Sequence, residues 1–217
     1  KIAITGSLGH IGSYLIREFS QYFDNLSLIL FDNLSTQRFS SLFNLPSSVT
    51  YQFFEKNVGE EDISEDIHNV DVLIHLAAIT DALSSFKNSD EVRNNNLQST
   101  ENVLKACIKT NIPMIFTSTT SVYGKQTTTV DENCSNKDLK PQSPYAEVKL
   151  LEEEMIREYI VNKHLKAVIC RLGTIFGPSS GMRFHTAVNK FCWQAFTNKP
   201  ITVWKTAYHQ KRPYLYI

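Results

Sequence analysis

Short apolar segments alternate along the chain with longer segments in which apolar residues recur at helical spacing. The short segments are too uniformly apolar to leave one face in water, which is typical of a parallel sheet with helices on both sides. The predicted strands are residues 1–5, 26–31, 50–54, 71–76, 114–118 and 165–171. The predicted helices are residues 11–22, 90–110 and 145–164. The pattern therefore predicts an α/β fold built on a doubly wound parallel sheet.

The last of these helices carries a dense set of charged residues, which are Glu147, Glu152, Glu153, Glu154, Arg157 and Glu158. Charged residues on an amphipathic helix normally face solvent. We therefore interpret them as the exposed outer face of that helix.

The alternation ends near Pro178, where the sequence Ser179-Ser180-Gly181 interrupts it. Beyond this point the pattern predicts a helix at 184–196, a strand at 201–204 and a final strand at 214–217. We place a boundary after residue 177, so that residues 178–217 begin a smaller second unit. Because the chain starts on a strand without a methionine and stops within another strand, we expect the natural protein to be longer.

Composition narrows the class of protein. Basic and acidic residues balance at 22 each, so no global field favours nucleic acid or an anionic membrane. No apolar run approaches the ~20 residues that span a bilayer, and the first residues do not show a charged-then-apolar leader pattern, so we expect neither membrane insertion nor secretion. Four cysteines lie far apart without zinc-ligand spacing, and they are Cys107, Cys134, Cys170 and Cys192. We expect a soluble cytoplasmic protein with reduced thiols and no metal.

A glycine-rich loop follows the first predicted strand and opens the first helix. Gly6 permits a tight turn, Gly9 lets the backbone approach a pyrophosphate, and Gly12 allows the helix to pack closely on the strand. The helix N-terminus adds free N–H groups and a positive dipole end. This context predicts a Rossmann-type dinucleotide site; the alternative is a tight turn without a ligand.

An acidic residue supports the dinucleotide interpretation. Asp32 ends the second predicted strand, about 20 positions after the last glycine, where a carboxylate can accept hydrogen bonds from the adenosine ribose. Its charge would repel a 2′-phosphate, so we predict NAD over NADP. Arg38 would reverse this preference if its side chain turned toward that phosphate.

Tyr145 and Lys149 lie one helical turn apart on the same face of a predicted helix. An adjacent ammonium favours the phenolate, so a tyrosine with an ordinary pKa near ~10 can serve as a base. Such a pair is also common on helix surfaces, which is the alternative. Upstream, residues 117–124 leave a strand at its carboxyl end with a cluster of hydroxyls that can bind a substrate alcohol or carbonyl.

The chain resembles the extended short-chain dehydrogenase/reductase family, in particular its NAD-dependent nucleotide-sugar epimerase and dehydratase branch, typified by UDP-glucose 4-epimerase. The resemblance covers nearly the whole chain. The matching segments are Thr5 to Gly12, Phe31 to Leu34, His75 to Ala78, Asn96 with Thr100, Ser118 to Gly124, Ser143 to Lys149, Arg171 to Pro178, and Arg212.

The resemblance implies a catalytic set and an NAD site. Tyr145 would be the acid and base, Lys149 would bind the nicotinamide ribose and lower the pKa of Tyr145, and Thr119 would fill the position of the catalytic Ser or Thr. The implied cofactor-binding residues are Gly6, Gly9, His10, Ile11, Gly12, Asp32, Asn33, Asn57, Val58, Leu76, Ala77, Ala78, Thr80, Asn96, Thr117, Ser118, Tyr145 and Lys149. We expect His10 to act through its backbone. Asn57 replaces the usual aspartate of the family.

The same resemblance implies that residues 178–217 begin a substrate-binding subdomain beside an NAD-binding domain of residues 1–177. The implied substrate residues are Thr119, Thr120, Tyr145, Thr174, His185, Thr186, Thr202, Trp204 and Arg212. Thr174 stands where the family usually has an asparagine that contacts the substrate diphosphate. A surface arginine is the alternative for Arg212, and a core tryptophan is the alternative for Trp204.

The implied reaction oxidises a sugar carbon with NAD while Tyr145 takes the hydroxyl proton, which gives a keto-sugar and NADH. Return of the hydride to the other face makes an epimerase, whereas loss of water makes a dehydratase and needs a further acid and base. Dehydratases of the family commonly place Asp-Glu after the catalytic threonine, but Thr119 is followed by Thr120-Ser121. We therefore expect a nucleotide-sugar epimerase acting at C4. A dehydratase, decarboxylase or reductase is the alternative, and a non-catalytic NAD-binding regulatory protein is a further one.

The expected partners are a nucleotide-diphosphate sugar and a second copy of the chain. Family members often dimerise through two long helices, which correspond here to residues 90–110 and 145–164. Neither nucleic acid nor a membrane is an expected partner.

Overall fold

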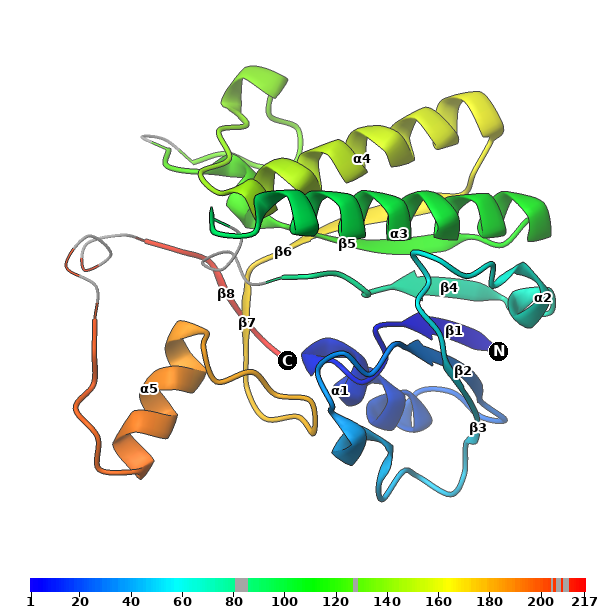
Figure 1. Ribbon diagram of the computed structural model, residues 1–217, viewed down its shortest axis with the longest axis horizontal. Coiled ribbons are helices and arrows are strands. Elements are labelled where there is room, and N and C mark those ends of the chain that lie inside the picture. Colours follow the sequence, from blue (N-terminus) through cyan, green and yellow to red (C-terminus); the bar gives the residue numbers. More distant parts are fainter. Residues whose placement is uncertain (81–85, 127–128, 204, 206–207, 209–210) are drawn as a thin grey trace.

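The computed structural model contains a six-stranded parallel sheet with strand order β3-β2-β1-β4-β5-β6 (Figure 1). It describes residues 1–217 except 81–85, 127–128, 204, 206–207 and 209–210. The strands are β1 (Ile2–Thr5), β2 (Ser27–Asp32), β3 (Thr50–Glu55), β4 (Val72–His75), β5 (Met114–Thr119) and β6 (Ala167–Leu172). This order reverses direction between β1 and β4, which confirms the predicted doubly wound fold.

Helices cover the sheet on both faces. The α-helices are α1 (His10–Glu18), α2 (Ser64–Ile67), α3 (Ser89–Thr110), α4 (Pro144–Lys163) and α5 (Ala187–Phe196). Short 3₁₀ helices follow at Phe19–Gln21, Phe39–Leu42, Thr120–Tyr123 and Asn136–Asp138. Helices α3 and α4 lie side by side on one face, and α1 lies on the other (Figure 1). The predicted helices are confirmed, with ends displaced by a few residues.

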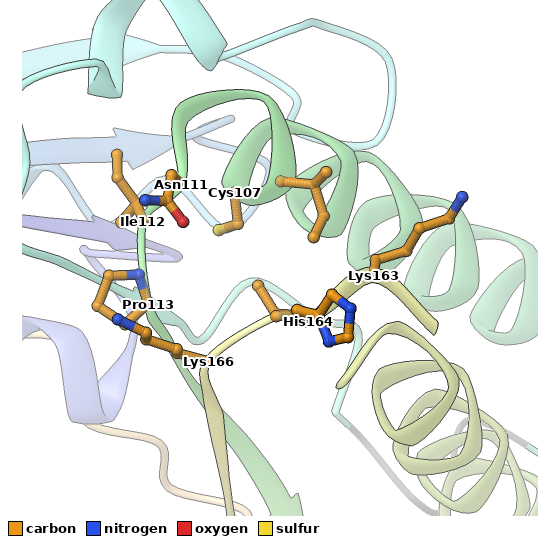
Figure 2. A pocket seen from close by; sticks show the side chains of 9 residues that line it. Cys107, Asn111, Ile112, Pro113, Lys163, His164 and Lys166 are labelled. Atoms are coloured by element: carbon orange, nitrogen blue, oxygen red, sulfur yellow. The ribbon is translucent and has the colours of Figure 1, made fainter. Parts of the chain in front are cut away.

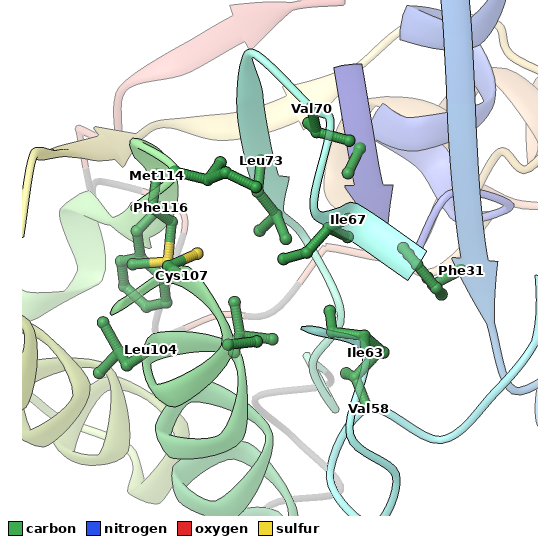
Figure 3. Close-up of a cluster of buried hydrophobic side chains, with 14 of the residues drawn as sticks. Phe31, Val58, Ile63, Ile67, Val70, Leu73, Leu104, Cys107, Met114 and Phe116 are labelled. Carbon is green, nitrogen blue, oxygen red and sulfur yellow. The ribbon is translucent and has the colours of Figure 1, made fainter. Parts of the chain in front are cut away.

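Alternate residues of each inner strand enter two different hydrophobic clusters. Ile4 and Leu28 pack with Ile16 of α1, whereas Phe31 packs with Leu104 of α3 on the opposite face (Figure 3). Successive strand side chains point to opposite faces, so a strand buried on both sides must be apolar at every position. This double burial explains the uniformly apolar segments of the sequence.

Two expectations about exposure were wrong. On β6, Val168 is 59% exposed, so the prediction of helices on both sides fails for that face of β6. On α4, Glu152 and Glu153 are completely buried instead of lying on an outer face, whereas Glu154 is exposed as predicted. The two glutamates face inward because each meets a cation and hydroxyl donors there.

A separate two-stranded parallel sheet pairs β7 (Thr174–Phe176) with β8 (Tyr214–Tyr216). The strand predicted at the end of the chain is thereby confirmed. The predicted division after residue 177 stays a prediction, and β7 from before that point pairs with β8 from after it.

The strand predicted at 201–204 is absent from its described residues, 201–203. The Thr202 N–H donates to Gln194 Oε1 of α5 at 3.2 Å, and Gln194 Nε2 donates to Thr202 Oγ1 at 3.0 Å. The backbone donor of Thr202 is thus satisfied by a helix side chain and not by a neighbouring strand. Trp204 lies outside the described residues.

Glu153 joins α4 to the two strands beside it. Its carboxylate accepts hydrogen bonds from Ser118 Oγ of β5 at 2.5 Å, from Arg171 Nη2 of β6 at 2.7 Å and from Arg157 Nη2 at 2.7 Å. Burial by itself raises the pKa of this carboxyl, but the bonds from Arg171 and Ser118 outweigh it and hold the pKa below its usual value. The ionised carboxylate therefore stabilises the fold.

We expect Glu153→Gln to lower the free energy of unfolding by about 3–5 kcal/mol at neutral pH, because it leaves a buried cation without its counter-charge. A group whose folded pKa is depressed stabilises above its unfolded pKa and loses that effect as pH falls through the folded value. The difference between wild type and variant, measured by urea unfolding, should therefore shrink below about pH 4. Glu158→Gln, on the exposed face of the same helix, is the control. A difference that stays constant with pH would contradict this assignment.

Candidate active site

Many of the predicted cofactor and catalytic residues lie at the carboxyl edge of the sheet. The glycine loop follows β1, Asp32 ends β2, the Leu76–Thr80 segment follows β4, and Thr117–Thr120 closes β5. In open α/β sheets this edge, at the point where strand order reverses, is where ligands bind. The topology therefore brings together residues that are far apart in the sequence.

The glycine loop packs against neighbouring backbone too closely for side chains at two of its positions. Gly6 has a φ of +64°, and a Cβ there would lie 2.7 Å from the Ala77 nitrogen. A Cβ on Gly12 would lie 2.5 Å from the Ser7 oxygen. At Gly9, within the described part of the chain, a Cβ would meet nothing nearer than the Gly6 oxygen at 3.3 Å. Gly9 is thus the least crowded of the three glycines in a tight turn at a helix N-terminus, a setting that suits a phosphate cradle.

Asp32 holds this cradle to the end of β2. One carboxylate oxygen accepts from the Leu8 N–H and the other from the Leu34 N–H, both at 3.0 Å. A carboxylate has further lone pairs, so ribose hydroxyls can still donate to it. Arg38 lies beside the loop, 3.9 Å from the position of a Cβ on Gly9. Burial lowers the pKa of Arg38, while the charge of Asp32 raises it.

The segment after β4 is fixed by side chains from β1 and α3. Thr5 Oγ1 accepts from the N–H groups of Leu76 at 3.2 Å and Ala77 at 3.3 Å. Asn96 is fully buried and uses both ends of its amide on Ile79, whose N–H donates at 2.8 Å and whose oxygen accepts at 3.0 Å. The amide of Asn96 thus shapes the cofactor-side loop; its direct contact with NAD stays a prediction.

Tyr145 and Lys149 lie in the first turns of α4. Ser143 caps this helix by accepting from the Ala146 N–H, and Pro144 occupies its first position. The ammonium of Lys149 is 3% exposed and lies 4.5 Å from the centre of the Phe116 ring. Burial raises the pKa of Tyr145, the charge of Lys149 lowers it, and the net direction is upward. The expected effect of Lys149 has the predicted sign, but burial outweighs it.

Arg183 is a site residue that the sequence did not reveal. Its Nη1 donates to Thr80 Oγ1, and its charge lowers the pKa of Tyr145. Asn189 of α5 fixes the loop that carries it, because its amide accepts from the Gly177 N–H and donates to the Arg183 oxygen. No motif contains Arg183, and only the folded chain places it beside Thr80.

The loop of residues 177–183 also binds the glycine loop directly. His10 Nε2 pairs with the Gly177 oxygen at 2.9 Å, and Ser179 Oγ donates to the His10 oxygen at 2.9 Å. The Gly181 N–H donates to Ser13 Oγ of α1 at 2.8 Å. The imidazole of His10 is therefore a structural link between two loops, and the expected contact of its backbone with the cofactor stays a prediction.

The model of the NAD dependent epimerase/dehydratase family matches residues 2–217. The chain belongs to this family. It is 32% identical, over its whole length and 69% of the relative, to an uncharacterized UDP-glucose epimerase of Bacillus subtilis (strain 168). It is 29% identical, over its whole length and 52% of the relative, to the dTDP-D-glucose 4,6-dehydratase of Dictyostelium discoideum.

Among solved structures, the UDP-glucuronic acid 4-epimerase of Bacillus cereus, in complex with UDP-glucuronic acid and NAD, superposes with a TM-score of 0.85. It is 29% identical and covers 99% of this chain, which corresponds to 68% of that protein. The chain thus spans between about half and two thirds of the length of these relatives. The comparison confirms the extended short-chain dehydrogenase/reductase architecture.

Several residues expected to bind NAD in this family already have partners in the protein. Ser118 Oγ donates to Glu153, and Thr117 Oγ1 donates to the His75 oxygen at 3.2 Å. Asn57 Oδ1 accepts from the Gly59 N–H at 3.1 Å, and the neighbouring Val58 is buried. Their contacts with a cofactor remain predictions. The remaining implied cofactor residues, Ile11, Asn33 and Ala78, lie along the same edge of the sheet.

The implied substrate residues fall into separate groups. Thr119 Oγ1 accepts from the Ser121 N–H and caps the short helix that begins at Thr120. Thr174 in β7 donates its N–H to the Pro213 oxygen at 2.9 Å, which places it near Arg212.

A second group of implied substrate residues lies at and beyond the start of α5. His185 directly precedes Thr186, the N-cap residue of that helix. Thr186 Oγ1 is buried and has no hydrogen-bond partner among the described residues. Thr202 is bonded to α5, as described above.

One cavity away from this edge of the sheet is small. A cavity of about 50 Å³ lies at the amino ends of β5 and β6, lined by Cys107, His164 and Lys166 among others (Figure 2). Ligand pockets usually hold about 300–1,000 Å³, so this cavity is too small for a nucleotide sugar. Burial raises the pKa of the Cys107 thiol to about 12, which keeps it protonated.

Neither a metal cluster nor a membrane span is found in the part of the chain that the structure describes. No group of three His, Cys, Asp or Glu side chains there is arranged to hold a metal ion. No helix in the same residues is both long and apolar enough to cross a bilayer.

We expect Asp32→Asn to weaken NAD binding by roughly 10- to 100-fold, because it removes a charged carboxylate that can accept hydrogen bonds from the ribose hydroxyls. Binding of NADP should change less, since the same charge repels the 2′-phosphate. Titration of both cofactors by fluorescence measures the ratio, with Asp24→Asn, an exposed acid before β2, as the control. Equal losses for both cofactors would mean that Asp32 acts only by holding Leu8 and Leu34.

Proposed function

We propose that the protein is an NAD-dependent 4-epimerase of a UDP-sugar. The observation that carries the proposal is the placement of Tyr145 and Lys149 at the carboxyl edge of the sheet, next to a turn that presents hydroxyl groups and no acid at residues 119–121. The family and the epimerases among its relatives support it. Because the chain spans only part of their length, the activity of the whole protein is a proposal.

The residues divide the chemical work between them. A bound NAD would supply the acceptor and donor of the hydride at the sugar carbon. Tyr145 accepts the proton of the sugar hydroxyl and returns it from its phenol, with Lys149 supplying positive charge that favours the phenolate. Thr119 offers a hydroxyl to the reacting oxygen. The glycine loop and Asp32 would hold the cofactor, as their geometry allows.

The alternative chemistries need groups that this turn lacks. Loss of water or of carbon dioxide from a keto-sugar requires more than one proton-transferring group. Dehydratases are among the relatives, so the scaffold supports that reaction. At the two positions after Thr119, however, this chain has Thr120 and Ser121, which are poor acids and bases at neutral pH. A purely regulatory role leaves the intact Tyr145 and Lys149 unexplained.

The expected homodimer through α3 and α4, and the cytoplasmic location, remain predictions within this proposal. The two helices lie side by side with a shared outer surface (Figure 1).

Incubation with UDP-, GDP-, CDP- and dTDP-sugars without added reductant should yield a new isomer of unchanged mass from a UDP-sugar, identified by mass spectrometry and NMR. We expect Tyr145→Phe to reduce this turnover by at least about 100-fold, since it removes the proton-transferring group, while NAD affinity stays within a few fold. A matched control is Tyr159→Phe, later on the same helix. A product lighter by water or carbon dioxide would reject epimerisation, and full activity of Tyr145→Phe would remove Tyr145 from its role.

The position of Arg183 favours an acidic sugar. Its guanidinium bonds Thr80 and its charge reaches Tyr145, so a cation faces the region between the cofactor loop and the catalytic base. A guanidinium binds a carboxylate strongly, often through two parallel hydrogen bonds. The Bacillus cereus relative is a 4-epimerase of UDP-glucuronic acid. We propose UDP-hexuronates as the preferred substrates.

We expect kcat/KM to be higher for UDP-glucuronic acid than for UDP-glucose, and Arg183→Gln to reduce that preference by roughly 10- to 100-fold, because it removes a charge-assisted bond. Arg212→Gln should lower kcat/KM for both substrates by the same factor if Arg212 binds the diphosphate that they share. An unchanged ratio in Arg183→Gln would exclude recognition of the carboxylate by this residue.

A further inference from the structure

A completely buried carboxylate lies beside the proposed catalytic lysine. Glu152 Oε2 is 3.1 Å from Lys149 Nζ, and the two side chains are 0% and 3% exposed. A buried ion pair of this kind is seldom the most stable solution, because apolar residues of similar volume often stabilise a protein as well or better. The proposed chemistry itself requires only the cation. Stability and the proposed chemistry therefore leave the buried Glu152 carboxylate unexplained.

Glu152 is also the end point of a buried chain of hydrogen bonds that begins at the cofactor-side loop. Thr5 Oγ1 accepts from the Leu76 and Ala77 N–H groups, so its own hydrogen is directed to His75 Nδ1 at 2.7 Å. His75 Nε2 then donates to Thr100 Oγ1 at 3.2 Å.

The final bond of this chain goes to the carboxylate. Thr100 Oγ1 donates to Glu152 Oε1 at 2.6 Å. Burial lowers the pKa of His75 to about 3, so the ring is neutral and has one donor and one acceptor, as this order requires. All donors point the same way. An ionised carboxylate, which only accepts, suits the end of this chain and carries the charge opposite to that of Lys149.

We propose that Glu152 is a positioning residue for Lys149. Its carboxylate holds the Lys149 ammonium in place relative to the cofactor-side loop. It also partly offsets the electrostatic effect of that ammonium on the Tyr145 phenol. The inference deepens the proposed function and rests on its assignment of Tyr145 and Lys149. The catalytic base is then controlled by the balance of two opposite charges on α4, and not by the lysine alone.

The charges around Tyr145 are consistent with this balance. Among the described residues, Lys149 and Glu152 of α4 and Arg183 of the loop before α5 act on it electrostatically. The two cations lower the pKa of Tyr145 and Glu152 raises it, in addition to the larger upward effect of burial. Neutralising Glu152 leaves both cations unopposed, so the phenol should ionise at lower pH.

The test is an ultraviolet titration of the Tyr145 phenolate in wild type and in Glu152→Gln. In each background, the curve of the matching Tyr145→Phe protein is subtracted, so that only the absorbance of Tyr145 remains. We expect the midpoint to fall by roughly one pH unit, which is the order of effect of removing one nearby unit charge at an effective dielectric constant of ~20. The acid limb of the pH profile of kcat should move the same way. Glu154→Gln removes the same charge from the exposed face of α4 and should leave the midpoint in place.

A second pair of variants covers the case in which Glu152→Gln does not fold. Lys149→Gln and the double variant Lys149→Gln/Glu152→Gln differ only in the carboxylate, and the double variant contains no unpaired buried charge at these positions. We expect the Tyr145 midpoint to be about one pH unit lower in the double variant. Equal midpoints in either comparison would overturn the proposal. These titrations need no substrate, so they remain decisive even if the protein epimerises none of the sugars offered.

Discussion

The close approach of β1 to β4 is the constraint on which the candidate site depends. Where these strands end, the turn at Gly6 lies so near Ala77 that no side chain fits between them. Thr5 binds the two segments together by accepting from the backbone of Leu76 and Ala77. The strand order reverses at the same place, which is where open α/β sheets of this kind bind dinucleotides.

The same threonine connects this crevice to the catalytic helix. Through His75 and Thr100 its hydrogen bonds reach Glu152, and through Glu152 they reach Lys149. A group that must meet both a cofactor and a base needs fixed geometry, and a buried chain of polar side chains supplies it. The other buried carboxylate of α4, Glu153, has a different structural role, because its arginine and serine partners tie the helix to the sheet.

Much of this architecture could be predicted from the sequence because it depends on local rules. Uniformly apolar segments indicate strands covered on both faces, and a glycine loop between strand and helix indicates a phosphate cradle. The burial of Glu152 could not be predicted, because a helix with acidic residues on most sides does not reveal which of them faces inward. Its partner Thr100 lies 52 residues away, and no periodicity reports a contact at that distance.

For residues 201–204, local residue preferences predicted a strand that the described residues 201–203 do not form. Its apolar and β-branched residues favour an extended backbone, but the side chain of Gln194 takes the bond that a neighbouring strand would need. Arg183 could not be found in the sequence for a related reason: its place depends on how Asn189 and Gly177 fold the loop around it. Tertiary contacts decided both cases.

The 177–183 loop and the glycine loop are packed directly against each other. Gly181 rests against the carbonyl groups of Leu8 and Gly9 with no room for a Cβ, since one would lie 2.2 Å from the Leu8 oxygen. An insertion or a bulkier residue on either side would push the two loops apart. The shape of the glycine loop therefore depends on a segment that lies far from it in the sequence.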